Sequence, residues 1–315
     1  MPLSSRAPAA DGRQSVAVDA GKENGKNGPA GDDPVGGMHP NRIFKGALLL
    51  VVPHMDDEVL ACGGTIAMLT PKKRIFAVYA TDGTKSPEPI VPWRDAVSSD
   101  LGGVRIGESK QAMGLLGVPE ENLEFFGFPD GRLANNEQAL VGRLKEVIER
   151  IDPSDMLIPF RYDRHPDHLA INRAALIACN ELTFEGNVFE YFVYHQYRLL
   201  PKKSMINYIH ARHLIEIDIA TVSDRKRKAL DVFKSQTTKF FSWQTRPNLK
   251  PDMLDEISHT PERFLRYDAA ASGPAVFDRC AAWIRTAHRL EPLIKRRKDR
   301  IAVLWDRGPG RKKGG

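Results

Sequence analysis

The chain alternates short aliphatic runs with amphipathic segments, and this alternation is the feature that most limits its possible folds. Four aliphatic runs predict buried strands, at 47–53, 74–84, 122–131 and 155–160. Three further segments predict helices, within 94–117, over 136–152 and over 165–179. Strands and helices in this order form βαβ units, because parallel neighbours need a crossover between them. We therefore expect an α/β fold with a mostly parallel sheet.

The ends of the chain differ in composition from its middle. Residues 1–41 contain few branched aliphatic side chains, so they cannot bury enough apolar surface to offset an ordering cost of ~1–2 kcal/mol per residue. Later segments predict strands at 190–196 and 213–219, a capped helix at 223–236 and a helix at 280–294. The expected parts are a disordered segment over 1–41, one folded domain over 42–294 and a flexible basic tail over 295–315.

Composition and charge narrow the possible classes of protein. Apolar residues make up 42% of the 315 residues, but no apolar run approaches the ~18 residues of a membrane span. The N-terminus lacks the apolar core of a signal peptide, and the three cysteines are far apart. These features predict a cytoplasmic protein with no transmembrane segment and no thiolate zinc site. Much of the net charge of +6 lies near the C-terminus, so we expect no specific nucleic-acid partner.

Two of the predicted strands end in clusters of histidine and aspartate. The motif PHMDDE follows the run at 47–53, and RHPDH follows the run at 155–160. The first cluster contains His54, Asp56 and Asp57, and the second contains His165, Asp167 and His168. Because the carboxyl ends of parallel strands meet at one edge of a sheet, both clusters should meet there. Glu58 instead suits the start of a following helix, where the helix dipole favours an acid.

The first cluster offers a pair of metal ligands. His54 and Asp57 are three residues apart, so in a tight turn their side chains point to the same side. A third ligand from the second cluster would complete a catalytic site with an open position for water. Asp56 could then act as a base on that water, whose pKa zinc lowers to ~7. His165 could polarise a carbonyl or donate a proton, with Asp167 as a partner that orients it.

These motifs resemble those of the PIG-L / LmbE-like family of zinc-dependent de-N-acetylases. That family carries H-P-D-D-E after its first strand and H-x-D-H after a later one. Supporting matches are TDG at 81–83, RIGESKQAMGLLG at 105–117, FPDG at 128–131 and KALDVFKSQ at 228–236. The resemblance spans residues 44–265. Met55 stands where the family usually has proline, which would stiffen the turn by fixing φ, but this departure removes no metal ligand.

The resemblance implies a Rossmann-like fold, with helices on both faces of the sheet, and hydrolysis of an N-acyl group. The group is usually the N-acetyl of an N-acetylglucosamine unit. The resemblance implies that the metal ligands are His54, Asp57 and His168, and that the base is Asp56. His165 matches the residue that stabilises the oxyanion or assists the leaving amine, and Asp167 matches its partner. Arg105 and Asp130 match positions that contact substrate. Zn²⁺ is the expected ion, and Fe²⁺ or another divalent metal could occupy the same site.

Two other functions are compatible with the same residues. A non-haem Fe(II) oxygenase also binds its metal through two histidines and a carboxylate, but it gives Asp56 no role. A non-catalytic carbohydrate or nucleic-acid binding protein would use the basic tail, and its binding of nucleic acid would depend strongly on salt. We expect a metal-dependent N-deacetylase whose substrate is a small N-acylated sugar or glycoconjugate.

Overall fold

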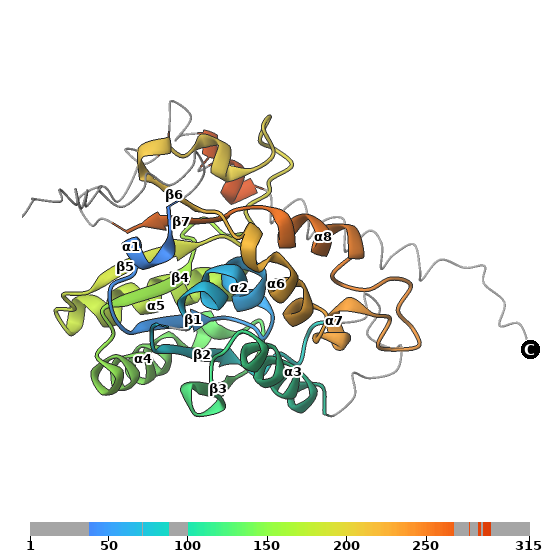
Figure 1. Ribbon diagram of the computed structural model, residues 1–315, viewed down its shortest axis with the longest axis horizontal. Coiled ribbons are helices and arrows are strands. Elements are labelled where there is room, and N and C mark those ends of the chain that lie inside the picture. The colour runs from blue at the N-terminus through green and yellow to red at the C-terminus, as the bar shows by residue number, and fades with distance from the viewer. Residues whose placement is uncertain are drawn as a thin grey trace, which may run out of the picture. The chain divides into compact units, whose positions relative to one another are not determined.

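β1 (Leu48–Val52) lies inside a mixed sheet with parallel neighbours on both sides. The computed structural model describes residues 38–70, 72–87, 100–267, 277, 283–284 and 286–290. Within these residues the strand order is β3-β2-β1-β4-β5-β7-β6 (Figure 1). The remaining strands are β2 (Ile75–Thr81), β3 (Leu123–Phe128), β4 (Asp155–Pro159), β5 (Asn187–Tyr191), β6 (Leu214–Ile217) and β7 (Glu262–Arg266). β1 to β5 pair in parallel, whereas β7 is antiparallel to β5 and to β6.

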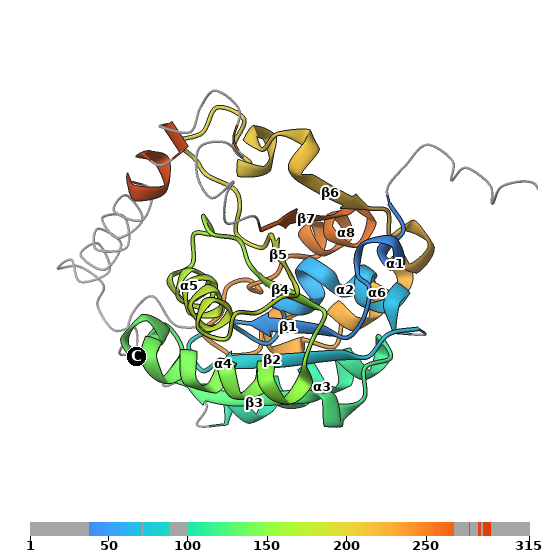
Figure 2. The same cartoon turned by 90° about the vertical axis from the view of Figure 1, so that its left-hand side faces the viewer.

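Side chains of β1 alternate between two hydrophobic clusters, because successive strand residues point to opposite faces. Leu48, Leu50 and Val52 belong to one cluster, and Leu49 and Val51 belong to the other. The first cluster includes residues of α2, α3, α6 and α8, and the second includes residues of α4 and α5 (Figures 1 and 2). The helices are α1 (Pro40–Ile43), α2 (Asp57–Leu69), α3 (Leu101–Leu115), α4 (Glu137–Ile151), α5 (Pro166–Glu181), α6 (Ser223–Leu230), α7 (Lys234–Thr237) and α8 (Pro251–His259). Burial on both faces explains the uninterrupted aliphatic sequence of β1.

This architecture confirms the predicted α/β fold with helices on both faces of a mostly parallel sheet. The parallel part, β3-β2-β1-β4-β5, has the strand order of a Rossmann-like fold. The strand predicted at 190–196 is shifted, since β5 ends at Tyr191. The helix predicted at 223–236 is divided into α6 and α7, and its start has no side-chain cap.

The sequence patterns did not predict α8 and β7. β7 reads Glu-Arg-Phe-Leu-Arg, and its first residue is a buried glutamate, so it lacks the aliphatic run of a central strand. In the helix predicted at 280–294, the described residues 283, 284 and 286–290 are helical. The predicted segments 1–41 and 295–315 lie almost wholly outside the described residues, and their boundaries stay predictions. Among the described helices, none combines the length and the apolar character that crossing a bilayer requires.

Candidate metal centre

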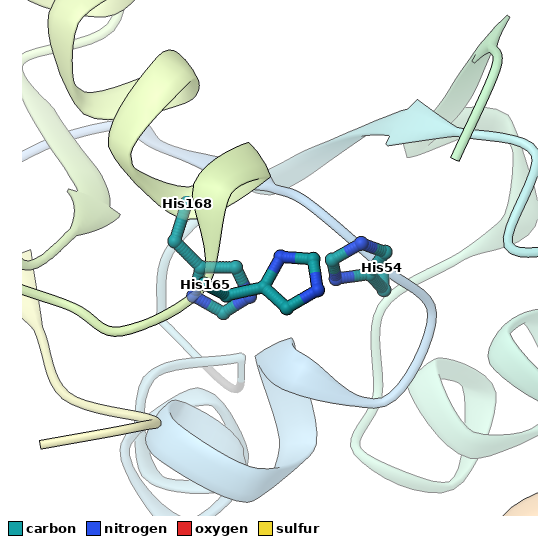
Figure 3. A group of neighbouring side chains, drawn as sticks. All are labelled: His54, His165 and His168. Atoms are coloured by element: carbon teal, nitrogen blue, oxygen red, sulfur yellow. The ribbon is translucent and has the colours of Figure 1, made fainter. Parts of the chain in front are cut away.

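The loop after β1 and the start of α5 bring three histidines together (Figure 3). The ring centroid of His54 lies 4.6 Å from that of His165 and 5.4 Å from that of His168. The centroids of His165 and His168 are 5.1 Å apart. This proximity follows from the sheet, since β1 and β4 are parallel neighbours and their carboxyl ends lie side by side.

Asp57 links two of these rings. Its Oδ2 atom lies 3.1 Å from Nδ1 of His54 and 3.1 Å from Nε2 of His168. The same oxygen accepts the backbone N–H of His54 at 3.1 Å, so the turn points the imidazole and the carboxylate of this pair to one side. The other oxygen, Oδ1, is buried and has no hydrogen-bond partner among the described residues. The three proposed ligands therefore meet at one carboxylate that has spare acceptor capacity.

Asp163 supports His168 from behind, and sequence reasoning did not select it. Its Oδ2 atom lies 3.2 Å from Nδ1 of His168 and accepts the backbone N–H of Tyr194 at 2.9 Å. Its Oδ1 atom accepts the backbone N–H of His165 at 2.8 Å. A carboxylate behind a histidine fixes the tautomer and the orientation of the ring that binds a metal. The available signal was the first of the two acids in DRHPDH, but the motif alone does not tell which acid faces His168.

Asp130 and Asp167 both contact the far side of His54. Each places a carboxylate oxygen 3.3 Å from Nε2 of this ring. The second oxygen of Asp130 accepts the backbone N–H of Lys85 at 3.0 Å, so this carboxylate joins a neighbouring loop to the centre. Asp167 accepts the backbone N–H of Gly131 at 2.6 Å. Asp130, expected as a substrate contact, thus lies in the centre itself.

His165 meets Asp167 in an unexpected way. The backbone N–H of Asp167, and not its carboxylate, lies 3.3 Å from Nδ1 of His165, which is the N-cap of α5. Because Nδ1 accepts this bond, a neutral His165 carries its proton on Nε2. Burial, together with the neighbouring His54 and His168, lowers the pKa of His165 to about 4, so the ring is neutral at pH 7. The carboxylate of Asp167 contacts His54 instead, so the expected orienting pair is replaced by a backbone contact.

Charges in the centre stabilise one another. Burial alone would raise the pKa of Asp57, but His168 and His54 outweigh burial and hold that pKa well below its usual range. Burial likewise opposes protonation of His168, but Asp163 and Asp57 raise the pKa of this imidazole to about 9. Protonated imidazoles therefore balance the negative charge of these carboxylates, and a bound metal ion would balance the same charge.

Asp56 differs from Asp57 because its carboxylate pairs with a guanidinium, whereas that of Asp57 pairs with imidazoles. Its φ of 134° is unusual for a residue with a side chain, and one carboxylate oxygen lies 3.2 Å from Nη2 of Arg105. Burial raises the pKa of Asp56 to about 7, while the Arg105 guanidinium counteracts that rise. A carboxylate with a pKa near neutrality suits proton transfer. Arg105, expected to contact substrate, is only 1% exposed.

Met55 takes the place of the family proline without opening the turn. Its side chain is fully buried, and its carbonyl oxygen accepts a hydrogen bond from Arg105. The methyl carbon Cε packs so closely against Gly83 that a Cβ on that glycine would lie 2.9 Å away. Gly83 also has a φ of +63°, which a residue with a side chain rarely adopts. Packing therefore stabilises the turn where a proline ring would have done so.

The donors in this centre fit a divalent cation. Among the described residues, two sets of three side chains have donor atoms that all lie within 4.8 Å of one another. One set is His54, His165 and His168, and the other is His54, Asp130 and Asp167. The unpartnered Oδ1 of Asp57 is a further donor, and an unsatisfied buried carboxylate oxygen is costly. Imidazole nitrogens with carboxylate oxygens suit zinc and other first-row metals.

A parallel α/β sheet that gathers buried histidines and aspartates at its carboxyl edge defines a Rossmann-like protein with a His/Asp centre. The sequence model of one family, PIG-L, described as GlcNAc-PI de-N-acetylase, matches residues 49–179. The chain is 30% identical over 141 residues to the uncharacterised deacetylase YaiS of Escherichia coli strain K12, which is 43% of this chain and 69% of that protein. The chain belongs to the PIG-L family, and the residues matched contain both clusters.

Two further relatives extend the comparison. A probable N-acetyl-alpha-D-glucosaminyl L-malate deacetylase 2 of Bacillus cereus is 26% identical over 199 residues, which is 60% of this chain and 83% of that protein. The solved N,N'-diacetylchitobiose deacetylase of Pyrococcus horikoshii superposes with a TM-score of 0.54 at 20% identity, covering 74% of this chain and 87% of that one. The structural likeness confirms the fold.

Proposed function

We propose that this protein is a zinc-dependent N-deacetylase that removes an acetyl or other acyl group from the nitrogen of an N-acetylglucosamine-type sugar or a related conjugate. The observation that carries the proposal is the centre itself. Asp57 joins His54 and His168 and keeps one buried oxygen without a hydrogen-bond partner, and the carboxylate of the preceding Asp56 pairs with Arg105. Relatives described as deacetylases of acetylated sugar conjugates support the substrate class.

His54, Asp57 and His168 would hold the metal. When bound there, a divalent cation supplies a Lewis acid for the amide carbonyl and makes hydroxide available at neutral pH. Asp163 keeps the His168 ring in one orientation, and Asp167 and Asp130 do the same for His54. These carboxylates also make the imidazoles stronger donors to a cation.

Asp56 and His165 would move the protons. The Asp56 carboxylate accepts a proton from the attacking water, and its raised pKa matches that task near neutral pH. Neutral His165 presents an N–H on Nε2, which can donate to the oxyanion that develops from the acyl carbonyl. The proton held by Asp56 then passes to the amine that leaves, and the products are the free acid and the amine.

The two alternative functions explain fewer residues. An Fe(II) oxygenase needs the two histidines and one carboxylate, but it leaves Asp56 and neutral His165 without a task. A binding protein without catalysis leaves the whole buried donor set unused. Membership of a de-N-acetylase family also favours hydrolysis. The choice of zinc, the identity of the sugar and the cytoplasmic location belong to this proposal.

The test is acetate release from a panel of N-acetylated sugars by the full-length protein, with and without a chelator. We expect release that stops after chelation and returns when zinc is added. Asp56→Asn should bind zinc normally and lose most of the turnover. No acetate from any substrate at any metal loading, or turnover by Asp56→Asn near that of the wild type, would contradict the proposal.

A further inference from the structure

The backbone at Asp56 adopts a conformation that needs support from its surroundings. Its φ of 134° and ψ of −30° lie in a region that residues with a side chain rarely occupy. Such conformations persist only where neighbouring groups fix them, and they occur often at functional sites. Asp56 immediately precedes α2, so its conformation decides where the carboxylate points relative to Asp57, the first residue of that helix.

Arg105 on α3 provides most of this support. Its Nη2 atom donates to the carbonyl of Met55, the residue before Asp56, and lies 3.2 Å from the Asp56 carboxylate. Its Nη1 atom donates at 3.0 Å to the carbonyl of Gly83 in the loop after β2. The planar guanidinium thus connects the carbonyl before Asp56 and the Asp56 carboxylate to the loop after β2. A lysine, with a single ammonium, does not reproduce this fork.

Glu58 holds the same turn through the backbone N–H of Asp56. One of its oxygens accepts the backbone N–H of Asp56 at 3.0 Å. The other accepts hydroxyl groups from Tyr79 at 3.0 Å and from Ser109 at 2.9 Å. Ser109 follows Arg105 by four residues, so both side chains leave the same face of α3. Glu58 therefore holds the backbone amide of Asp56, and Arg105 on α3 holds the carbonyl of Met55 and the carboxylate of Asp56.

We propose that Arg105 is a positioning residue that fixes the Asp56 carboxylate before substrate binds. The role of Asp56 as base rests on the proposed function. Arg105 is 1% exposed, and both terminal nitrogens of its guanidinium are engaged by the protein. A guanidinium that is buried and engaged in this way orients the groups that it contacts.

Kinetics of Arg105→Gln and Arg105→Lys test this role. We expect kcat to fall by about 10- to 100-fold, because a base displaced by ~1 Å loses that much, while KM stays within about twofold and zinc affinity is unchanged. Arg105→Lys should recover only part of the loss. Lys110→Gln, which removes a half-exposed cation from the same helix, is the matched control and should leave kcat unchanged. A raised KM with kcat retained would overturn the proposal and make Arg105 a substrate contact.

A crystal structure of each Arg105 variant gives a readout that does not depend on turnover. We expect the Asp56 carboxylate to move and its φ to leave the positive region, while His54, Asp57 and His168 keep their places. An unchanged Asp56 in Arg105→Gln would overturn the positioning role even if the wild type released no acetate from the panel. If Arg105→Gln fails to fold, the same comparison with Arg105→Lys decides the question.

Discussion

Asp163 shows how a residue can control a candidate metal centre without being one of its proposed ligands. It contacts Nδ1 of His168 and accepts the backbone N–H groups of His165 and Tyr194, so it joins the start of α5 to the loop after β5. Burial alone would raise the pKa of Asp163, but His168 outweighs this and keeps the carboxyl ionised. Its negative charge therefore increases the basicity of the ligand and restricts the rotation of the ring.

Replacing this carboxylate should weaken metal binding. For Asp163→Asn we expect zinc affinity to fall by about 10- to 100-fold, because the amide is neutral and orients His168 less strongly. Competition with a chelator of known affinity would measure the change. Asp155→Asn, another fully buried aspartate, at the opposite ends of the strands, is the matched control. Equal losses in the two variants would indicate general destabilisation and contradict a specific role.

Asp56 should lower the stability of the metal-free protein at neutral pH and above. Burial raises its pKa in the folded state to about 7, above its usual value, so the folded state binds a proton that the unfolded state has released. That stabilising proton is lost as pH rises through about 7. In protein treated with chelator, Asp56→Asn should therefore raise the melting temperature more at pH 8 than at pH 5. A difference of equal size at both pH values, measured by calorimetry, would refute this.

At the scale of elements, α3 and α7 together hold the loop that follows β2, at residues 85 and 86. Glu108 on α3 accepts the backbone N–H and the hydroxyl of Ser235 at 2.8 and 2.6 Å. Gln236 then donates to the carbonyl of Ser86 at 2.8 Å, and the preceding Lys85 donates its backbone N–H to Asp130. The KSQ part of the motif at 228–236 is thus connected to Asp130, and so to the His/Asp centre, through this loop.

Cutting this connection should affect substrate binding more than chemistry. We expect Gln236→Ala to raise KM several-fold and to change kcat by less than about twofold, because the metal ligands and Asp56 keep their own supports. Gln138→Ala, on the exposed surface of α4, is the control. Steady-state kinetics on the best substrate of the panel would measure both constants. A fall in kcat with KM unchanged would show that the loop acts on the chemistry instead.

The sequence predicted some helices and strands of the fold better than others. The strand ends that carry His54 and His168 were predictable, because long aliphatic runs end in polar clusters and parallel strands bring such ends together. β7 and α8 were not, since the burial of Glu262 in β7 depends on Lys226, which is 36 residues away in the sequence. The role of Arg105 was also hidden, because residue type does not tell whether a guanidinium faces substrate or the backbone.

At the scale of the whole molecule, one buried ion pair connects α6 and β7, late in the chain, to α2. Lys226 of α6 donates to Glu262 of β7 at 2.8 Å and to the carbonyl of Leu60 in α2 at 3.0 Å. Glu262 also accepts the backbone N–H groups of Gly64 and Thr65 at 2.7 and 2.8 Å. A Cβ on Gly64 would lie 2.5 Å from Ile219, so the glycine pair after Cys62 allows this close approach.

Removing one partner of this pair should destabilise the whole domain. Lys226 and Glu262 have side chains only 1% and 2% exposed, so Lys226→Met leaves an uncompensated carboxylate in the interior. We expect the free energy of unfolding in urea to fall by about 3–5 kcal/mol. The double variant Lys226→Met, Glu262→Gln should lose less than Lys226→Met alone, because the glutamine stays neutral and still accepts a helix N–H. If the double variant loses as much stability as the sum of the two single variants, the ion pair does not couple α6 and β7 to α2, and their hydrophobic packing joins them instead.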